Sequence, residues 1–235
     1  MDAAEFLQIV GLSLRVSLSA SLLALLLGAP VGAWLAASRG AAKEGWLTAF
    51  NVLLALPPVV LGLLLYMAFS RSGPLGALDL LFTPSVMILA QWMLALPIVV
   101  VLVHRSSAAV WTDYGEPLRL DVPRTGRRVV ELLSMARAGL ATAFLAAFGR
   151  TISEVGAVLI VGGNIRYQTR VMTTAITLET SQGRFLFASA LGGVLILLSL
   201  LVTLGTGWVG RRAGGRSTHR PRGRAPERRA LARRA

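Results

Sequence analysis

The stretch FGRTISEVGAVLIVGGNIRYQTRVMTTAITLETSQG (residues 148–183) places two charged residues, Arg150 and Glu154, inside an apolar run that ends in glycines. The rest of the chain is apolar enough to lie in a lipid bilayer, since 54% of its residues are hydrophobic and its mean hydropathy is +0.66. Ionisable side chains within membrane segments are energetically expensive and tend to be functional. The charged pair is therefore the first candidate for a functional site.

The apolar residues gather into long runs, which is typical of a membrane protein. A helix needs about 20 residues to cross the hydrocarbon. Five runs qualify, at residues 12–37, 46–69, 84–103, 137–162 and 186–209. The start of the chain lacks the pattern of a signal peptide, so we expect the first run to be retained as a span. The sequence predicts an all-α membrane protein with five transmembrane helices in a domain over residues 1–210.

Arginine and lysine are unevenly distributed between the two sides of this topology. Cytoplasmic loops are enriched in these residues, and the bias predicts an N-terminus outside and a C-terminus in the cytoplasm. Residues 211–235 carry ten arginines and one glutamate, which supply +9 of the net charge of +13. We expect this tail to be disordered and attracted to anionic lipid headgroups. Nucleic-acid binding is not expected, because no aromatic residue interleaves the arginines as a stacking surface would require.

Helix-breaking and polar residues lie within two of the predicted spans. The tetrapeptide Leu-Ala-Leu-Pro occurs at residues 54–57 and 94–97. A proline inside a membrane helix persists where neighbours or a water-filled cavity satisfy the freed carbonyls. Pro57, Pro97 and the polar Gln91 are thus candidates for lining a translocation path through two kinked helices. The alternative is the ordinary tolerance of membrane helices for proline.

Arg150 and Glu154 are four residues apart, so they lie on one face of a helix, one turn from each other. They can neutralise one another, and Ser153 adds a hydroxyl beside them. Glycines at positions 149 and 156 leave room for a second helix to approach closely. Arg150, Ser153 and Glu154 are therefore candidates for the path or its gate, and the alternative is an ion pair with a structural role.

The end of the fourth run carries further polar residues. The sequence at 162–164, Gly-Gly-Asn, suits the end of a helix, because both residue types tolerate the left-handed conformation, and Asn164 joins the candidates for the path. Arg166 and Arg170 follow outside the membrane, where they could dock an acidic surface of an outer partner or remain in a solvated loop. Arg15 in the first run lies close enough to the helix end for its charge to reach the interface.

Residues 111–130 form a second concentration of charge that is too polar to span a membrane. Leucines among the charges indicate a short surface helix for a partner's groove, starting near Pro117 and ending at Pro123. The alternative is a loop whose arginines only fix the orientation. Within residues 113–128, the candidates for contact with a cytoplasmic partner are Gly115, Glu116, Pro117, Leu118, Leu120 and Asp121.

Enzyme motifs are missing from the sequence. It contains no G-x-x-x-x-G-K-[ST] phosphate loop, no G-x-S-x-G and no H-E-x-x-H. Cysteine is absent and the two histidines lie far apart, so neither a disulfide nor a Cys/His metal site is expected. We therefore expect no catalytic residue, metal or cofactor in this chain. If the protein moves a solute uphill, a separate subunit must hydrolyse the ATP.

From about residue 5 to residue 209 the chain resembles the membrane-spanning subunit of a type I ABC importer. Those permeases carry a cytoplasmic loop that begins Glu-Ala-Ala, has a glycine six positions later, and leads to a span containing Gly-Glu-Phe-Gly. Counted without gaps, Glu154 and Gly156 fall on that last element. The loop itself departs from the pattern, because residues 115–117 read Gly-Glu-Pro and Asp121 replaces the glycine. The resemblance implies a short coupling helix within residues 113–128.

Within this superfamily, three segments resemble the permeases for molybdate, sulfate and tungstate, most closely the tungstate branch: residues 70–84, 90–100 and 148–166. The resemblance implies import of an oxyanion, first of all tungstate, by alternating access in the cell (inner) membrane. It implies three partners: an ATPase subunit that holds ATP and Mg, a periplasmic or lipid-anchored oxyanion-binding protein, and a second copy of the chain. The alternative from another class is a membrane scaffold or passive channel with a basic partner-recruiting tail.

Overall fold

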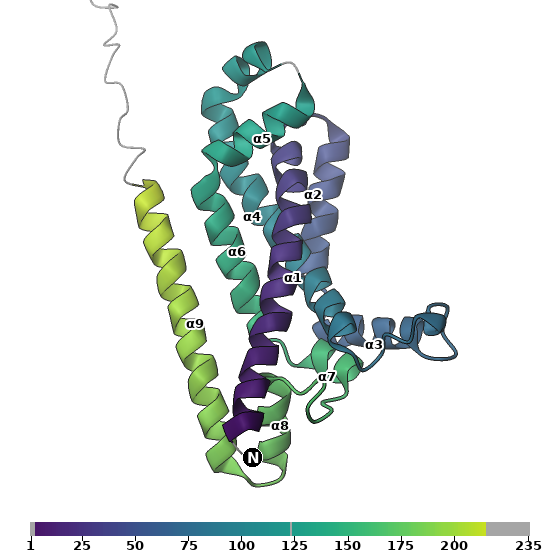
Figure 1. Ribbon diagram of the computed structural model, residues 1–235. Helices are drawn as coiled ribbons and strands as arrows, with labels where there is room; N and C mark the ends of the chain where they lie inside the picture. Colours follow the sequence, from purple (N-terminus) through teal and green to yellow (C-terminus); the bar gives the residue numbers. More distant parts are fainter. Residues whose placement is uncertain (1–2, 123, 215–235) are drawn as a thin grey trace, which may run out of the picture.

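The computed structural model describes residues 3–122 and 124–214, and the regular structure in this part of the chain is helical (Figure 1). This confirms the all-α membrane class predicted from the sequence. The elements are α1 (Ala3–Ala37), α2 (Ala41–Leu54), α3 (Pro58–Phe69), the short 3-10 helix η1 (Gly76–Leu78), α4 (Pro84–Asp121), α5 (Thr125–Met135), α6 (Arg137–Ile152), α7 (Gly156–Gly162), α8 (Met172–Ser181) and α9 (Phe185–Gly214).

Three of the described helices, α1, α4 and α9, are long and apolar enough to cross a membrane. Two pairs meet the same standard together but are bent, α2 with α3 by 95° and α5 with α6 by 78°. Within the described ranges, length and composition thus allow three crossings, or up to five if each bent pair crosses once. The five-span topology stays a prediction.

Helix α1 is the central element of the bundle and contacts α4, α5, α6 and α8 (Figure 1). The short helices α7 and α8 lie near its N-terminal end, whereas α5 crosses the opposite end. Helix α3 points sideways from the bundle, and α9 packs against α6 and α8 at its edge. The two ends of the molecule therefore carry different short elements, joined by the long helices.

The packing of α1 against α4 depends on small residues. Ala24, Ala29, Ala33 and Ala36 of α1 belong to one buried cluster with apolar residues of α4. A Cβ atom at Gly32 would lie 2.7 Å from the Val100 carbonyl oxygen, closer than any side chain allows. Membrane helices gain packing energy by such close approach, because lipid supplies little hydrophobic driving force between them.

We expect Gly32→Ala to lower the melting temperature of the detergent-purified protein. The added methyl group must push α1 away from α4, and overpacking of this kind costs about 1–3 kcal/mol. Size-exclusion chromatography of heated samples measures the effect. Gly193→Ala on α9 is the matched control, because a Cβ at that position meets nothing within 4 Å. Equal melting temperatures for the two variants would contradict the close contact.

The two Leu-Ala-Leu-Pro sequences behave differently in the structure. The first ends at Pro57, after α2 has stopped at Leu54, and α3 begins at Pro58. Pro58 also lacks a backbone N–H, and it favours an extended conformation for the residue before it, Pro57 (φ −63°, ψ 126°). This extended residue separates α2 from α3. The other sequence ends at Pro97, which is buried inside the continuous helix α4.

The short helix that the sequence predicts from Pro117 does not form. Helix α4 continues through Pro117 to Asp121, so that prediction is wrong. Trp111 and Leu118 pack against the buried cluster shared by α1 and α4, which offsets the backbone hydrogen bond that the proline removes. The separate short helix is α5, which follows. The predicted end at Pro123 lies outside the described residues.

Two other predicted segments also differ. The run at residues 137–162 forms two helices, because α6 ends at Ile152 and α7 begins at Gly156. Helix α9 continues to Gly214, so residues 211–214 are helical and not disordered as expected. Arginine is a good helix former, and an established helix adds residues easily. The remainder of the predicted disordered tail lies outside the described residues.

Candidate functional site

The break between α6 and α7 is the centre of the candidate site. The Ser153 hydroxyl donates to the Gly149 carbonyl at 2.9 Å, a local hydrogen bond that competes with regular helix geometry. The Glu154 N–H donates to the Thr151 carbonyl at 3.1 Å, which closes a tight turn. Backbone groups at such a helix end need partners from elsewhere in the protein, because lipid offers none.

Glu154 holds the two sides of the break together. Its side chain is only 5% exposed and forms an ion pair with Arg150 of α6 at 2.5 Å. The other carboxylate oxygen accepts the Ala157 N–H at 3.2 Å, in the first turn of α7. A negative charge at a helix N-terminus is favourable, since the free N–H groups there carry partial positive charge. Thr173 of α8 donates to the Glu154 carbonyl at 2.8 Å.

A polar network connects the break to the long helices. Gln91 of α4 donates through Nε2 to the Thr151 carbonyl at 3.0 Å. The hydroxyls of Thr151 and of Ser21 on α1 lie 3.1 Å apart. All three side chains are buried, and Oε1 of Gln91 has no hydrogen-bond partner among the described residues. The network thus joins α1, α4 and α6 at one level of the bundle.

Four of the predicted path residues therefore meet at the break: Gln91, Arg150, Ser153 and Glu154. Pro57 lies nearby, two residues before Val59. The side chain of Val59 packs on Gly156, where an added Cβ atom would lie 2.6 Å from it. The other two lie elsewhere. Pro97 is six residues beyond Gln91 on α4, which is about 9 Å of helix. Asn164 follows the far end of α7 with a φ angle of 52°, and its buried Oδ1 has no hydrogen-bond partner in the described part of the chain.

The predicted docking arginines belong to a second cluster. Arg166 reaches the Glu5 carboxylate with two nitrogens, at 2.9 and 2.6 Å, and Arg170 reaches it at 3.1 Å. Glu5 is buried in the first turn of α1, before the predicted span at 12–37. The Arg166 hydrogen bond holds the pKa of Glu5 below its ordinary value, against the opposing effect of burial. Sequence reasoning missed this contact, because 161 residues separate Glu5 from Arg166.

We expect Glu5→Gln to lower the melting temperature at neutral pH, because it removes the negative charge that pairs with Arg166 and Arg170. The folded-state pKa of Glu5 is lowered from 4.5, so its stabilising effect is complete above that value and is lost as the pH falls through the folded-state pKa. The difference between wild type and Glu5→Gln should therefore shrink below pH 4.5. Thermal denaturation across the acid range measures it. A difference that stays constant with pH would contradict this linkage.

The residues predicted to contact a cytoplasmic partner lie around the end of α4. Gly115 is buried against the Trp111 ring, Leu118 is half-buried, and Glu116 is exposed. Leu120 is 79% exposed. Pro117 and Asp121 are also exposed. In this segment Leu120 is therefore the apolar side chain most open to a partner.

Within residues 3–122 and 124–214, no three His, Cys, Asp or Glu side chains group so that they could hold a metal ion. No protein-family model matches the sequence.

Individual proteins do match, over most of the chain. A probable anion ABC transporter permease protein of Haloferax volcanii is 38% identical over 205 residues, 85% of this chain and 88% of that one. The tungstate uptake system permease protein TupB of Peptoclostridium acidaminophilum is 34% identical over 83% of this chain and 85% of its own. TupB of Campylobacter jejuni is 40% identical over 62% and 61%. Permeases named for molybdenum transport match at 26–31% identity.

Apolar helices long enough to cross a membrane, together with relatives named as permeases, identify the chain as a multi-pass membrane permease. The chain belongs to the family of ABC transporter permeases, as its relatives at 38% and 34% identity show. It is thus a permease subunit without an ATPase site of its own, and ATP hydrolysis belongs to a separate subunit. This membership leaves no support for the scaffold or passive channel.

Proposed function

We propose that this permease imports an oxyanion into the cytoplasm and that tungstate is its main substrate. The observation that carries the proposal is the similarity, over most of the chain, to a permease of a tungstate uptake system. Identity to the tungstate relatives exceeds identity to those named for molybdenum transport. Molybdate and sulfate are the alternative substrates, because both are tetrahedral dianions like tungstate.

The proposed mechanism is alternating access by two copies of the chain. A periplasmic or lipid-anchored oxyanion-binding protein would deliver the anion to the outer face, where Arg166, 54% exposed, offers positive charge more readily than Arg170, 15% exposed. The N-terminus would lie outside and the C-terminus in the cytoplasm. ATPase subunits, holding ATP and Mg, would change the relative stability of the outward and inward states, which shifts the population between them.

The segment at residues 113–128 is the proposed contact with the ATPase. It comprises the end of α4 and the first turn of α5. The exposed Leu120 would enter an apolar groove of the partner, with Glu116 and Asp121 beside it at the polar rim. Gly115, Pro117 and Leu118 would shape the segment, since Gly115 and Leu118 pack inward.

We expect uptake of labelled tungstate to disappear when the gene is deleted and to return with the wild-type gene. Unlabelled tungstate should compete more strongly than equal concentrations of molybdate or sulfate. Stronger competition by molybdate would reassign the substrate. Uptake that persists after deletion, in a strain without parallel routes, would remove the proposal.

The break is the proposed gate, and Glu154→Gln tests it. Glutamine can still accept the Ala157 N–H, but the ion pair with Arg150 is lost. Hydrogen bonds to charged groups contribute about 1.5–3 kcal/mol, and 1.4 kcal/mol corresponds to about a tenfold change in an equilibrium. We therefore expect tungstate uptake to fall about tenfold or more, with normal amounts of protein in the membrane.

The matched control is Glu179→Gln. Glu179 is also a buried glutamate in an ion pair, with Arg184 at 2.6 Å, but it lies in α8 away from the break. Its replacement should leave uptake near the wild-type rate. Loss of membrane insertion in Glu154→Gln would instead show that the Arg150–Glu154 pair is structural.

A further inference from the structure

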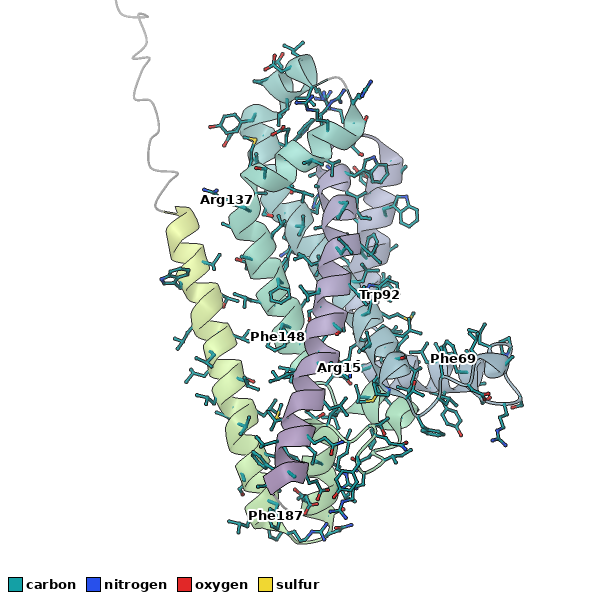
Figure 2. All side chains as sticks on the ribbon, viewed as in Figure 1. Arg15, Phe69, Trp92, Arg137, Phe148 and Phe187 are labelled. Atoms are coloured by element: carbon teal, nitrogen blue, oxygen red, sulfur yellow. The ribbon has the colours of Figure 1, made fainter. Side chains whose placement is uncertain are left out.

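A cavity of about 620 Å³ lies between α1, the start of α4 and the loop after α7. We call it the Arg15 cavity. Its lining includes Gln8, Arg15, Phe82, Thr83, Tyr167 and Gln168. Figure 2 shows Arg15 on α1 at the level of α3 and α7. The cavity is open to the surroundings and contains one charged side chain, the guanidinium of Arg15.

Arg15 differs from four other arginines near this end of the molecule. Arg150, Arg166, Arg170 and Arg184 each form an ion pair with a glutamate. Arg15 forms no ion pair or hydrogen bond with any residue of the described ranges. A positive charge in an apolar run is costly, and such residues in membrane proteins face a cavity and a partner or mark an ion pathway. The observed neighbourhood supplies the cavity but not the partner.

The remaining polar lining can donate hydrogen bonds, and none of it is acidic. Gln8 already donates to the Tyr167 carbonyl at 2.8 Å, which fixes its amide at the cavity wall. Gln168 and Thr83 add an amide and a hydroxyl. Helix α4 begins here, so the positive end of its dipole adds to the charge of Arg15. A guanidinium with neutral donors and no carboxylate is suited to an oxyanion and not to a cation.

The walls of the cavity are held in an uncommon backbone conformation. Phe82 and Tyr167 have φ angles of 60° and 64°, in the left-handed region that aromatic residues rarely adopt. Phe82 is fixed there by its N–H, which donates to the Val161 carbonyl at 2.9 Å. Strained residues of this kind cluster at ligand-binding sites, where the surrounding structure maintains them.

The position of the cavity fits a stage on the route to the break. Along α1, Arg15 lies ten residues beyond Glu5 and six before Ser21, which is about 15 Å and about 9 Å of helix. Ser21 belongs to the polar network at the break. The cavity is thus placed between the Glu5 cluster and the proposed gate.

We propose that the Arg15 cavity is an oxyanion-binding site, in which the Arg15 guanidinium and the Gln8, Gln168 and Thr83 side chains hold a tetrahedral anion before it passes the break. The identity of that anion as tungstate rests on the proposed function. The class of ligand, a tetrahedral oxyanion, is inferred from the charge and the hydrogen-bond donors of the cavity. A phospholipid headgroup offers the same tetrahedral oxyanion chemistry, so the test separates a free anion from a lipid.

The experiment uses the full-length protein in nanodiscs of phosphatidylcholine or of phosphatidylglycerol. Phenylglyoxal modifies accessible arginines, and peptide mass spectrometry measures the extent at Arg15 with and without sodium tungstate. We expect tungstate to slow modification of Arg15 at least tenfold in phosphatidylcholine, and to leave Arg71 unaffected. Arg71 is the internal control, because it lines a neighbouring cavity that also contains Asp79.

Equilibrium dialysis of labelled tungstate gives a second measurement. Arg15→Gln should weaken binding at least tenfold, Arg15→Lys should retain part of it, and Arg71→Gln should bind like wild type. Equal binding by wild type and Arg15→Gln, or protection of Arg15 by phosphatidylglycerol but not by tungstate, would overturn the proposal. The wild-type protection measurement requires no variant, so a folding defect in Arg15→Gln cannot decide the outcome.

The two proposals fail in distinguishable ways. If cells take up tungstate through this protein but Arg15 is neither protected nor needed for binding, the cavity proposal is wrong and the transport proposal stands. If tungstate protects Arg15 in nanodiscs but deletion of the gene leaves uptake unchanged, the site stands and the transport assignment is wrong.

Discussion

A backbone carbonyl without a hydrogen-bond partner is strongly destabilising in lipid, and the interior of this protein is arranged around that constraint. The break between α6 and α7 frees carbonyls in the middle of an apolar bundle. Gln91 of α4 reaches the Thr151 carbonyl, and Thr173 of α8 reaches the Glu154 carbonyl. The break therefore persists because two other helices satisfy it, and it ties them to one level of the bundle.

The other charged, polar and closely packed positions follow one another along helix α1. Its first turn holds the Glu5 cluster, its next turns carry Arg15 and Ser21, and its last turns pack closely on α4 through Gly32. The charged and polar positions are thus at one half and the small apolar positions at the other. In the proposed route, an anion meets the positive charge of Arg15 before it reaches Ser21 and the break, which is the order that an entry site followed by a gate requires.

The sequence predicts the features that depend on local pattern. Long apolar runs identify the membrane class, and the four-residue spacing of Arg150 and Glu154 places them on one helix face, where the structure pairs them. Hydropathy does not detect the break at Ser153, because the break depends on hydrogen bonds, some local and some to other helices. The same limit applies to Pro117, which tertiary packing keeps inside α4.

Local sequence pattern cannot predict contacts between residues that are distant in the sequence. Glu5 and Arg166 are 161 positions apart, and no periodicity connects them. Arg15, considered alone, can place its charge at the interface. Its cavity becomes visible only when the start of α4 and the loop after α7 close around it.

The geometry of Glu154 indicates how the proposed gate would respond to a distant event. One carboxylate contacts Arg150 of α6 and the first turn of α7, so a movement of α7 relative to α6 must break one of the two contacts. Gln91, which holds the end of α6, belongs to the same continuous helix as Glu116, 25 residues or about 38 Å away. A displacement of α4 at the end that carries Glu116 would therefore act directly on the Thr151 carbonyl. Coupling between distant sites requires an element that both ends can bias, and α4 with the break has that form.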